Sequence, residues 1–384
     1  MKKIYLDHNA TTPVLPEVIE AMTPYFGGDF GNASSIHSFG RTARVAIERS
    51  REIIAALIDC NPEELTFTSG GTESDNLAVK GTAFARVGRG RHIITSAIEH
   101  HAVLESCHYL ERKGFEVAYL KPDREGMISP DDLRRAIRPD TILVSLMHAN
   151  NEIGIIQDIA EMAAIAHERE IVFHTDAVQS TGKLKLRIGE LGVDLLSASA
   201  HKFYGPKGVG LLYVRKKVKI EPLSHGGSHE FNRRAGTENV AGIVGMAKAL
   251  ELAVGSIQSE ADRLSKIKDK FIGLIKSKVS DALILGRQDR CVPNTVSIAF
   301  RGVEAESIAL GLDLKGIAVS TGSACSSGTI NASHVINSLG LPPEYAHGAI
   351  RFSFGRSNSI DEVEAIVEAV AEEVARIRMI SPIR

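Results

Sequence analysis

Short apolar segments that end in polar residues recur along the first two thirds of this 384-residue chain. Segments of this kind lie at residues 64–68, 92–95, 117–120, 141–146, 171–174, 193–196 and 209–214. Helical patterns, such as the one at 159–169, alternate with them. Near-continuous apolar strands that alternate with helices are typical of a mainly parallel sheet covered on both faces. The chain is therefore predicted to have an α/β fold.

Polar side chains gather just after several of these predicted strands. A glycine-containing turn, 69–72, follows the first strand and precedes a predicted helix. His100 follows the second strand, Asp176 comes after 171–174, and Lys202 follows 193–196. Parallel strands end at one edge of a sheet, and α/β proteins bind ligands at that edge. The sequence thus predicts a site at one rim of the sheet.

After about residue 215, apolar strands and helices no longer alternate regularly. Residues 224–229 and 233–239 read as loops, and a long helix is expected at about 240–278. Beyond it, strands at 295–300 and 351–354 and a helix at 360–377 indicate an α+β unit. We therefore predict a large domain at 13–255. A smaller domain is predicted from 1–12 together with 256–384.

Composition narrows the partners that can be expected. Lys and Arg number 45 and Asp and Glu 47, which gives a net charge of −2 with no long basic run, so nucleic acid is not an expected partner. No apolar stretch approaches the ~20 residues of a membrane span, and the start lacks a signal-peptide core. We expect a cytoplasmic protein with no membrane contact. No two of the four cysteines form a C-x-x-C pair, so neither a zinc site nor a disulfide framework is indicated.

The polar residues at the rim match what pyridoxal phosphate requires of a protein. Lys202 offers an amine for a Schiff base, Asp176 a carboxylate for the pyridine nitrogen, and His100 a flat group to stack on the ring. Donors for the phosphate group would come from Gly71, Thr72, Ser199 and His201. Each residue has an ordinary alternative, because Lys202 and His100 suit a surface and Asp176 suits a helix cap.

Six segments resemble the NifS/IscS-type cysteine desulfurases, which belong to the class V aminotransferase family and depend on pyridoxal phosphate. They occur in the same order as in that family and are residues 5–13, 67–77, 148–154, 201–208, 322–326 and 350–356. The similarity extends over about residues 4–382. It implies the aspartate-aminotransferase-like fold (pyridoxal-phosphate fold type I). It also implies L-cysteine as substrate and a homodimer with active sites at the subunit interface.

The resemblance implies a role for individual residues. Lys202 would hold the cofactor and shuttle a proton, and Asp176 would pair with the pyridine nitrogen. Gln179 would contact the ring hydroxyl, Asn151 would lie beside the cofactor and substrate, and His100 would stack on the ring and act as an acid or base. The phosphate would be bound by Thr72, Ser199, His201 and, from the partner subunit, Thr237.

The same resemblance assigns the substrate contacts. Arg351 would grip the substrate carboxylate, for which a guanidinium is well suited, with help from Asn32. A plain salt bridge is the alternative role of Arg351. Two departures from the family pattern stand near the site: Ala200 replaces a usual glycine, and His8-Asn9 replaces a usual Tyr/Ser pair.

Cys325 lies among Ser, Gly, Ala and Thr residues at 320–329, which predicts an exposed loop. A free thiol has a pKa of ~8.5, so part of it is thiolate near neutral pH. The resemblance makes Cys325 the sulfur acceptor. It would receive sulfur as a persulfide and pass it to an iron–sulfur scaffold protein.

Other functions remain open at this stage. The same fold serves aminotransferases and selenocysteine lyases, although an aminotransferase has no need of Cys325. The chain could instead be an assembly platform in which Cys325 is a metal ligand of an iron–sulfur cluster shared with a scaffold protein. A nicotinamide dehydrogenase is disfavoured, because no G-x-G-x-x-G follows an early strand.

Overall fold

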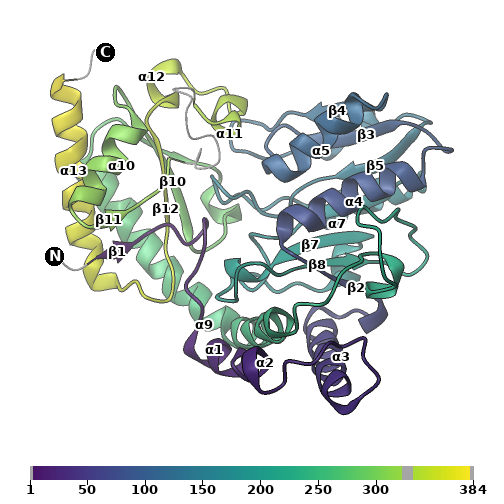
Figure 1. The fold of residues 1–384 in the computed structure, drawn as a ribbon. Coiled ribbons are helices and arrows are strands. Elements are labelled where there is room, and N and C mark those ends of the chain that lie inside the picture. The colour runs from purple at the N-terminus through teal and green to yellow at the C-terminus, as the bar shows by residue number, and fades with distance from the viewer. Residues whose placement is uncertain (1–2, 322–331, 381–384) are drawn as a thin grey trace.

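A seven-stranded sheet forms the centre of the larger part of the molecule (Figure 1). The computed structural model describes residues 3–321 and 332–380. The strands in chain order are β2 (Leu65–Thr68), β3 (His92–Ser96), β4 (Glu116–Leu120), β5 (Thr141–Ser145), β6 (Val172–Asp176), β7 (Leu195–Ser199) and β8 (Gly210–Val214). Their order across the sheet is β2-β8-β7-β6-β5-β3-β4, and β8 alone runs antiparallel to its neighbours. The predicted α/β fold with a mainly parallel sheet is confirmed.

Two strands reach further toward the rim than the apolar pattern predicts. β6 includes Asp176, and β7 continues to Ser199. The polar side chains inside these strands bond to each other, because His174 Nε2 lies 3.0 Å from Ser197 Oγ and His174 Nδ1 lies 2.8 Å from Ser145 Oγ. Buried polar groups that are satisfied in this way do not end a strand. Asp176 therefore sits at the end of a strand and not in the loop after it.

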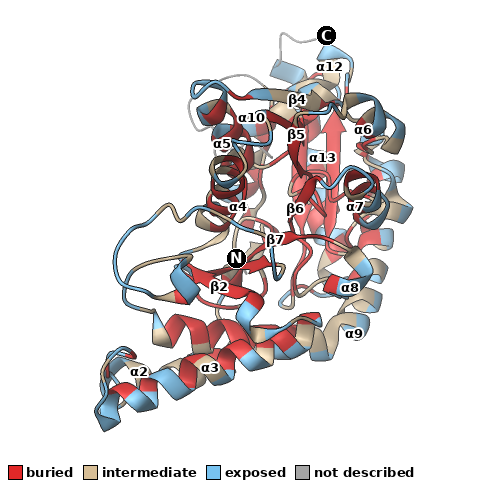
Figure 2. Cartoon of the chain, turned by 90° about the vertical axis from the view of Figure 1, so that its right-hand side faces the viewer, coloured by how far each residue is buried: buried red, intermediate tan, exposed pale blue. Residues whose placement is uncertain are grey.

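Helices cover both faces of the sheet, as Figure 2 shows with the sheet viewed near its edge. On one face lie α4 (Gly71–Ala85) and α5 (His101–Glu111), whose Leu77 and Val103 pack in one apolar cluster with Val172 and Leu195. On the other face, Met162 of α7 (Ile159–His167) packs in a second cluster with Phe173. The remaining helices of this part are α1 (Pro16–Met22), α2 (Pro24–Gly27), α3 (Ser38–Ile58), α6 (Pro130–Ala136) and α8 (Ile188–Leu191).

A proline and a capping histidine determine where two helices near the N-terminus begin. α1 and α2 are separate helices, because Pro24 has no N–H to continue α1 and instead opens α2. α3 begins at Ser38. The preceding residue, His37, accepts a hydrogen bond from Gly40 N and so caps the helix.

The C-terminal part contains a second sheet and a separate apolar cluster. β9 (Ala282–Leu285), β10 (Thr295–Phe300) and β12 (Ala349–Ser353) form an antiparallel sheet, and β1 (Ile4–Tyr5) pairs in parallel with β11 (Ile317–Ala318). The helices here are α10 (Ala305–Leu314), α11 (His334–Ser338), α12 (Pro343–Ala346) and α13 (Val363–Ile380). Leu6 joins this cluster, which otherwise draws on 264–377. The division at residues 12 and 255 stays a prediction.

α9 (Val240–Lys278) has the bounds predicted from its pattern and passes from one cluster to the other. Its Leu250 packs in the first and its Phe271 in the second. Contrary to the sequence-based expectation, one 18-residue window of α9 has a mean hydropathy of 1.6 and enough apolar length to cross a membrane. Half of that window is buried inside the protein, which is how a core helix acquires such a composition.

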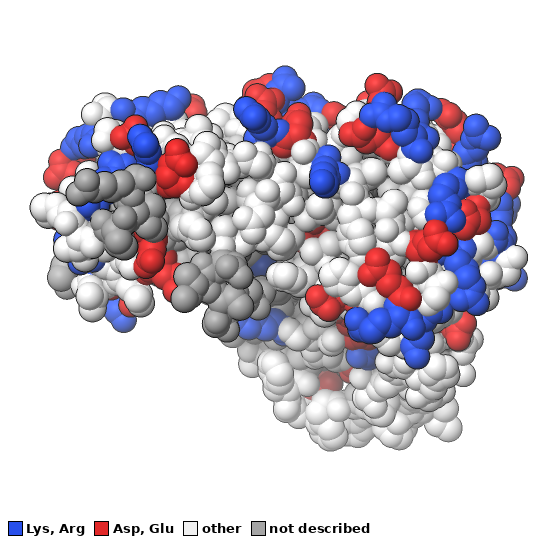
Figure 3. Space-filling model, turned by 90° about the horizontal axis from the view of Figure 1, so that it is seen from above, with Lys and Arg blue, Asp and Glu red and all other residues white. Residues whose placement is uncertain are grey.

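Charged side chains of both signs lie intermixed on the face seen in Figure 3. Many are paired, as Arg138 is with Glu116 and with Asp140. Short 3₁₀ helices complete the described secondary structure at Pro62–Glu64, Ala200–Lys202, Glu230–Asn232, Gln288–Arg290 and Ile360–Glu362.

Candidate active site

Lys202 stands at the end of β7, in the short 3₁₀ helix Ala200–Lys202. Its Nζ donates to the carbonyl oxygens of Asn9 at 2.6 Å and of Ala10 at 2.8 Å. These two carbonyls belong to the N-terminal segment, which also pairs through β1 with β11 of the C-terminal part. The side-chain amine is therefore held where the two parts of the molecule meet.

Asp176 ends β6, the parallel neighbour of β7. Its carboxylate is only 5% exposed and accepts a hydrogen bond from Val178 N at 2.8 Å. Burial raises the pKa of Asp176 to about 6, and the nearby Lys202 opposes that rise. Behind it, burial and the charge of Asp176 hold the pKa of Asp75 well above its usual value. A buried carboxylate of this kind is stabilised by a cationic partner, and a protonated ring nitrogen is one.

His100 caps the N-terminus of α5. Its Nδ1 accepts a hydrogen bond from Ala102 N at 3.1 Å, so the proton of the neutral ring is placed on Nε2. Burial, followed by the charge of Lys202, lowers the pKa of His100 to about 4. The ring is therefore neutral at physiological pH and suited to stack on an aromatic ligand.

The N-terminus of α4 offers unpaired backbone N–H groups, because no side chain caps this 15-residue helix. Gly70, at φ 154°, makes the turn in a conformation that favours glycine. A Cβ on Gly71 would lie 2.8 Å from Val178 Cγ2 and 3.5 Å from Ser199 Cβ, so only glycine leaves the turn open. Thr72 is exposed at the helix start. Gly71, Thr72 and Ser199 thus lie together, as a phosphate cradle requires.

His201 lies beside Lys202 and is held by the N-terminal segment. Its Nδ1 is 3.1 Å from Thr11 Oγ1, and its carbonyl oxygen accepts from Thr12 N at 2.9 Å. Burial and the charges of Lys202 and Lys207 lower the pKa of His201 to about 4. The ring is neutral and can donate one hydrogen bond to a phosphate oxygen.

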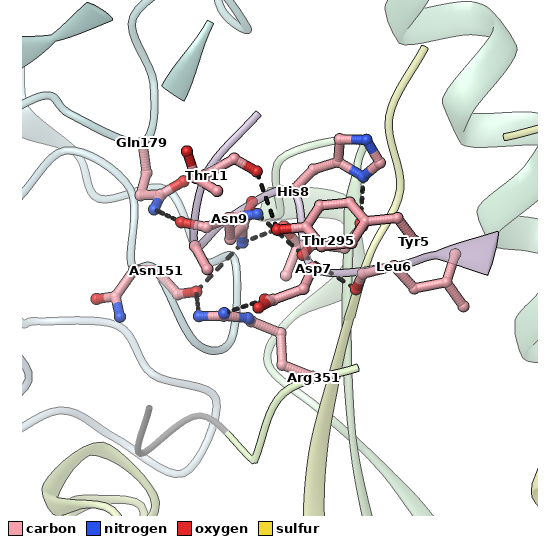
Figure 4. A network of polar contacts seen from close by, with 12 residues as sticks. Tyr5, Leu6, Asp7, His8, Asn9, Thr11, Asn151, Gln179, Thr295 and Arg351 are labelled. Atoms are coloured by element: carbon pink, nitrogen blue, oxygen red, sulfur yellow. Dashed lines mark hydrogen bonds and ion pairs between the residues drawn. The ribbon is translucent and has the colours of Figure 1, made fainter. Parts of the chain in front are cut away.

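Arg351 lies in the middle of β12, and Figure 4 shows it beside Asp7 and the Asn151 backbone. It is 4% exposed, and its Nη2 donates to Asp7 Oδ1 at 2.6 Å in a partly buried ion pair. Its Nη1 donates to Asn151 O at 2.8 Å, while its Nε is buried without a partner among the described residues. The salt bridge considered from the sequence is therefore present, and the guanidinium still has a donor to spare for a substrate carboxylate.

Asn9 is the centre of a network of hydrogen bonds, which Figure 4 shows with Gln179, Thr295 and Asn151 around it. Its carbonyl oxygen accepts from Gln179 Nε2 at 2.9 Å as well as from Lys202. Its side-chain Nδ2 donates to Thr295 Oγ1 at 2.8 Å and to the Asn151 carbonyl oxygen at 3.2 Å. In the sequence Asn9 stands out only as a departure from the family pattern, and its link between the two parts of the molecule appears only in the structure.

Asn151 and Gln179 both reach this region. The Asn151 backbone joins Asn9 to Arg351, and in Figure 4 its side chain points away from that network. The Gln179 amide is buried, and its Oε1 accepts a hydrogen bond from Lys183 Nζ at 2.8 Å. Lys183 was not predicted as a site residue, because its contacts with Gln179 and Asn9 appear only in the folded chain.

The structure does not bring Asn32 and Thr237 into this cluster. Both are exposed, and Asn32 Oδ1 accepts from Ser34 N at 2.9 Å within its own loop. The loops that carry the two residues are joined, because Ser34 Oγ lies 3.1 Å from His229 Nε2. Cys325 falls outside the described residues.

The residues of the rim fit pyridoxal phosphate. The open glycine turn at the α4 N-terminus suits the phosphate, the buried Asp176 carboxylate suits a ring nitrogen that carries a proton, and Lys202 lies on the strand next to Asp176. An α/β fold with these groups at its rim defines a pyridoxal-phosphate enzyme of fold type I.

The chain belongs to the aminotransferase class-V family, whose model matches residues 4–366. A cysteine desulfurase IscS of Dictyoglomus turgidum is 54% identical over 381 residues, covering 99% of this chain and 97% of that protein. A cysteine desulfurase IscS of Methanosarcina thermophila is 51% identical over 383 residues, covering 100% and 94%.

Comparison with solved structures leads to the same family. A NifS-like protein superposes with a TM-score of 0.92 at 38% identity and covers 98% of this chain and 100% of its own. SspA in complex with cysteine superposes with a TM-score of 0.81 at 37% identity, covering 92% and 99%. Within its family the chain is thus a pyridoxal-phosphate-dependent cysteine desulfurase, as the sequence motifs predicted.

Proposed function

We propose that this cysteine desulfurase moves the sulfur of L-cysteine onto Cys325 and passes it to an iron–sulfur scaffold protein. The Cys325 thiolate attacks the substrate sulfur, so an S–S bond forms as the C–S bond breaks. The electron pair of the broken bond stays on the substrate carbon, which takes up a proton and becomes the methyl group of L-alanine. The observation that supports this most is the grouping of Lys202, Asp176 and His100 at one rim, opposite Arg351.

Pyridoxal phosphate, when bound, supplies an electron-accepting ring that stabilises charge at the substrate α-carbon. Lys202 holds the cofactor covalently and, when released, moves the α-proton with its amine. Asp176 keeps the ring nitrogen protonated, which its position at the end of β6 and its burial favour. Gln179 contacts the ring hydroxyl through its amide.

The remaining cofactor and substrate contacts belong to the same proposal. His100 stacks on the ring as a neutral imidazole and exchanges a proton through Nε2. Asn151 lies beside the cofactor, and Arg351 binds the substrate carboxylate with the N–H groups that Asp7 leaves unused. The phosphate is held at the start of α4 by Gly71 and Thr72, together with Ser199 and His201.

A second copy of the chain is proposed to complete the site. Large apolar side chains are exposed over α2 and the start of α3, with Phe26 71% and Ile36 91% exposed. Exposed patches of this kind mark protein contacts. Asn32 lies within this surface, and the loop that carries Thr237 is joined to it through Ser34 and His229. A homodimer that covers this surface would deliver Thr237 to the partner's phosphate and Asn32 to the partner's substrate.

A cytoplasmic location is part of the proposal. The three cysteines in the described ranges, Cys60, Cys107 and Cys291, are free thiols. Unpaired thiols are typical of proteins from reducing compartments.

The test is formation of L-alanine from L-cysteine by the cofactor-loaded protein in the presence of a thiol reductant. We expect Lys202→Ala and Cys325→Ser to lose it, and Cys60→Ser to keep it, because burial raises the pKa of Cys60 to about 12 and keeps that thiol unreactive. Undiminished alanine from Cys325→Ser would point to a lyase or an aminotransferase. No alanine from a protein that binds the cofactor would favour the assembly platform.

A further inference from the structure

The loop that carries Thr237 is fixed to the large sheet by a buried ion pair between Arg51 of α3 and Glu230. Both side chains are 3% exposed. Arg51 Nη1 and Nη2 donate to the two oxygens of Glu230 at 2.9 and 2.8 Å. Glu230 Oε2 also accepts from Phe67 N at 2.8 Å and so supplies an acceptor to β2, the outer strand of the sheet. One end of the loop is therefore anchored.

The backbone at this anchor has an unusual conformation. Glu230, Phe231 and Asn232 have φ angles of 46°, 57° and 61°, in the left-handed region that residues other than glycine rarely adopt. Such a conformation persists only where the surrounding structure holds it in place. The Arg51 guanidinium does so here, because it binds Glu230 and lies 5.1 Å from the centroid of the Phe231 ring. The start of the loop is therefore shaped by contacts within its own chain.

A second ion pair ties the same loop to the glycine turn at the start of α4. Arg234 Nε donates to Glu73 Oε1 at 2.9 Å, and the two side chains are 25% and 23% exposed. Glu73 lies in the first turn of α4, and its Oε2 accepts from Ser69 N at 2.6 Å. One carboxylate thus joins the turn proposed to bind the cofactor phosphate to the loop that carries Thr237.

We propose that Arg234 is a positioning residue for the cofactor phosphate of the partner subunit, because its ion pair with Glu73 sets the place of Thr237 three residues further along the chain. The inference rests on the proposed dimer and the proposed role of Thr237, and it extends both. The residues between them have little freedom, since Gly236 N donates to His229 Nδ1 at 3.3 Å. Thr237 itself is exposed and can face a second copy of the chain.

The two residues of this ion pair should differ in which subunit they affect. Without Arg234, the Glu73 carboxylate still accepts from Ser69 N and keeps the turn of its own subunit in shape. The loop offered to the partner would lose an anchor, so the effect should fall on the partner's cofactor site. Loss of the Glu73 charge should instead affect both sites, because Glu73 contacts both the turn and the loop.

The experiment uses mixed dimers and measures cofactor binding in place of turnover. Two full-length chains with different affinity tags are produced together, and dimers that contain one of each are purified on both tags. One subunit carries Lys202→Ala, so only the other can bond pyridoxal phosphate covalently. The cofactor is fixed to Lys202 with borohydride at a series of concentrations, and the modified peptide is quantified by mass spectrometry. Arg234→Gln is placed either on the Lys202→Ala subunit or on the subunit with Lys202 intact.

With Arg234→Gln on the Lys202→Ala subunit, we expect the cofactor concentration for half-modification to rise about fivefold, the upper range for a partly exposed ion pair. In the other arrangement it should stay within about twofold of the parent. Arg234→Lys keeps the charge and should recover most of the affinity. Thr237→Ala should show the same asymmetry with a rise of about tenfold, because it removes a hydrogen bond to a charged group. Arg134→Gln, which breaks an exposed pair with Glu168 on α6, should match the parent in both arrangements.

An unchanged affinity with Arg234→Gln, or equal effects in the two arrangements, would overturn the inference. If Arg234→Gln does not fold, Glu73→Gln on the Lys202→Ala subunit decides, because unchanged binding there would overturn it equally. The inference and the proposed function fail separately. Asymmetry with Thr237→Ala but none with Arg234→Gln would refute the role of Arg234 alone. A chain that stays monomeric, or Thr237→Ala without asymmetry, would refute the proposed delivery of Thr237 and the inference with it.

Discussion

Replacing Asp7 by Asn tests how the substrate-binding arginine is held before substrate arrives. Asp7 and Arg351 are separated by more than three hundred residues in the chain, yet their side chains lie 2.6 Å apart, with exposed fractions of 18% and 4%. Removing one partner of a buried pair leaves the other charge unpaired, which costs about 3–5 kcal/mol. Because Asp7 is partly exposed, we expect the lower end, about 3 kcal/mol.

This loss of unfolding free energy corresponds to a decrease in melting temperature. An entropy of unfolding of about 2.1 cal/mol/K per residue gives about 0.8 kcal/mol/K for 384 residues. Asp7→Asn should therefore melt about 4 °C below the parent in differential scanning calorimetry. The matched control is Asp140→Asn, which removes an exposed partner of Arg138. Exposed pairs contribute about 0–1 kcal/mol, so the control should move by about 1 °C or less.

Binding of L-alanine provides a second test of the role of Asp7. L-alanine, the product, carries a carboxylate that gives Arg351 a partner again. The difference in melting temperature between parent and Asp7→Asn should therefore shrink when L-alanine saturates the cofactor-loaded proteins. A variant that melts with the parent, or a difference that L-alanine leaves unchanged, would refute the idea that Asp7 holds the arginine in the absence of substrate.

Two further predictions concern buried groups near the site. Burial raises the pKa of Glu99 to about 8 from 4.5, so the folded protein keeps a proton that the unfolded chain releases, and stability falls as pH rises from about 4.5 to 8. Glu99→Gln should flatten that fall in melting temperature between pH 6 and 8, and an identical slope would contradict the assignment. A Cβ on Gly210 would lie 2.5 Å from the Gly70 carbonyl carbon, so Gly210→Ala should weaken pyridoxal-phosphate binding at least about tenfold by displacing the turn. Gly255→Ala on α9 has open space and should bind the cofactor like the parent, and equal affinity in both variants would remove the glycine argument.

Local pattern was enough to predict much of the fold. The bounds of α9 and β10 match the apolar periodicity, because both segments carry it without interruption. The rim site could also be placed, since parallel strands end at one edge. Lys202, Asp176 and His100 follow or end such strands, and the structure brings them to one region.

Contacts between distant parts of the chain were not predictable in the same way. Neither the Asp7–Arg351 pair nor the link from Asn9 to Lys202 leaves a trace in local spacing. In the sequence, Lys183 is simply a lysine that follows a turn. Its hydrogen bonds to Asn9 and Gln179 are apparent only in the structure. The extension of β7 was missed because Ser197 resembles a loop residue, and its bond to a buried histidine appears only in the folded sheet.

Transfer of sulfur to Cys325 is the central step of the proposed mechanism. The most direct measurement uses L-cysteine labelled with a heavy sulfur isotope and the cofactor-loaded protein without reductant, followed by mass spectrometry of its peptides. We predict one labelled sulfur atom on the peptide that contains Cys325 and one equivalent of L-alanine, both lost in Lys202→Ala. L-alanine formed while the label is absent from Cys325, or present equally on Cys60 or Cys291, would contradict the central claim.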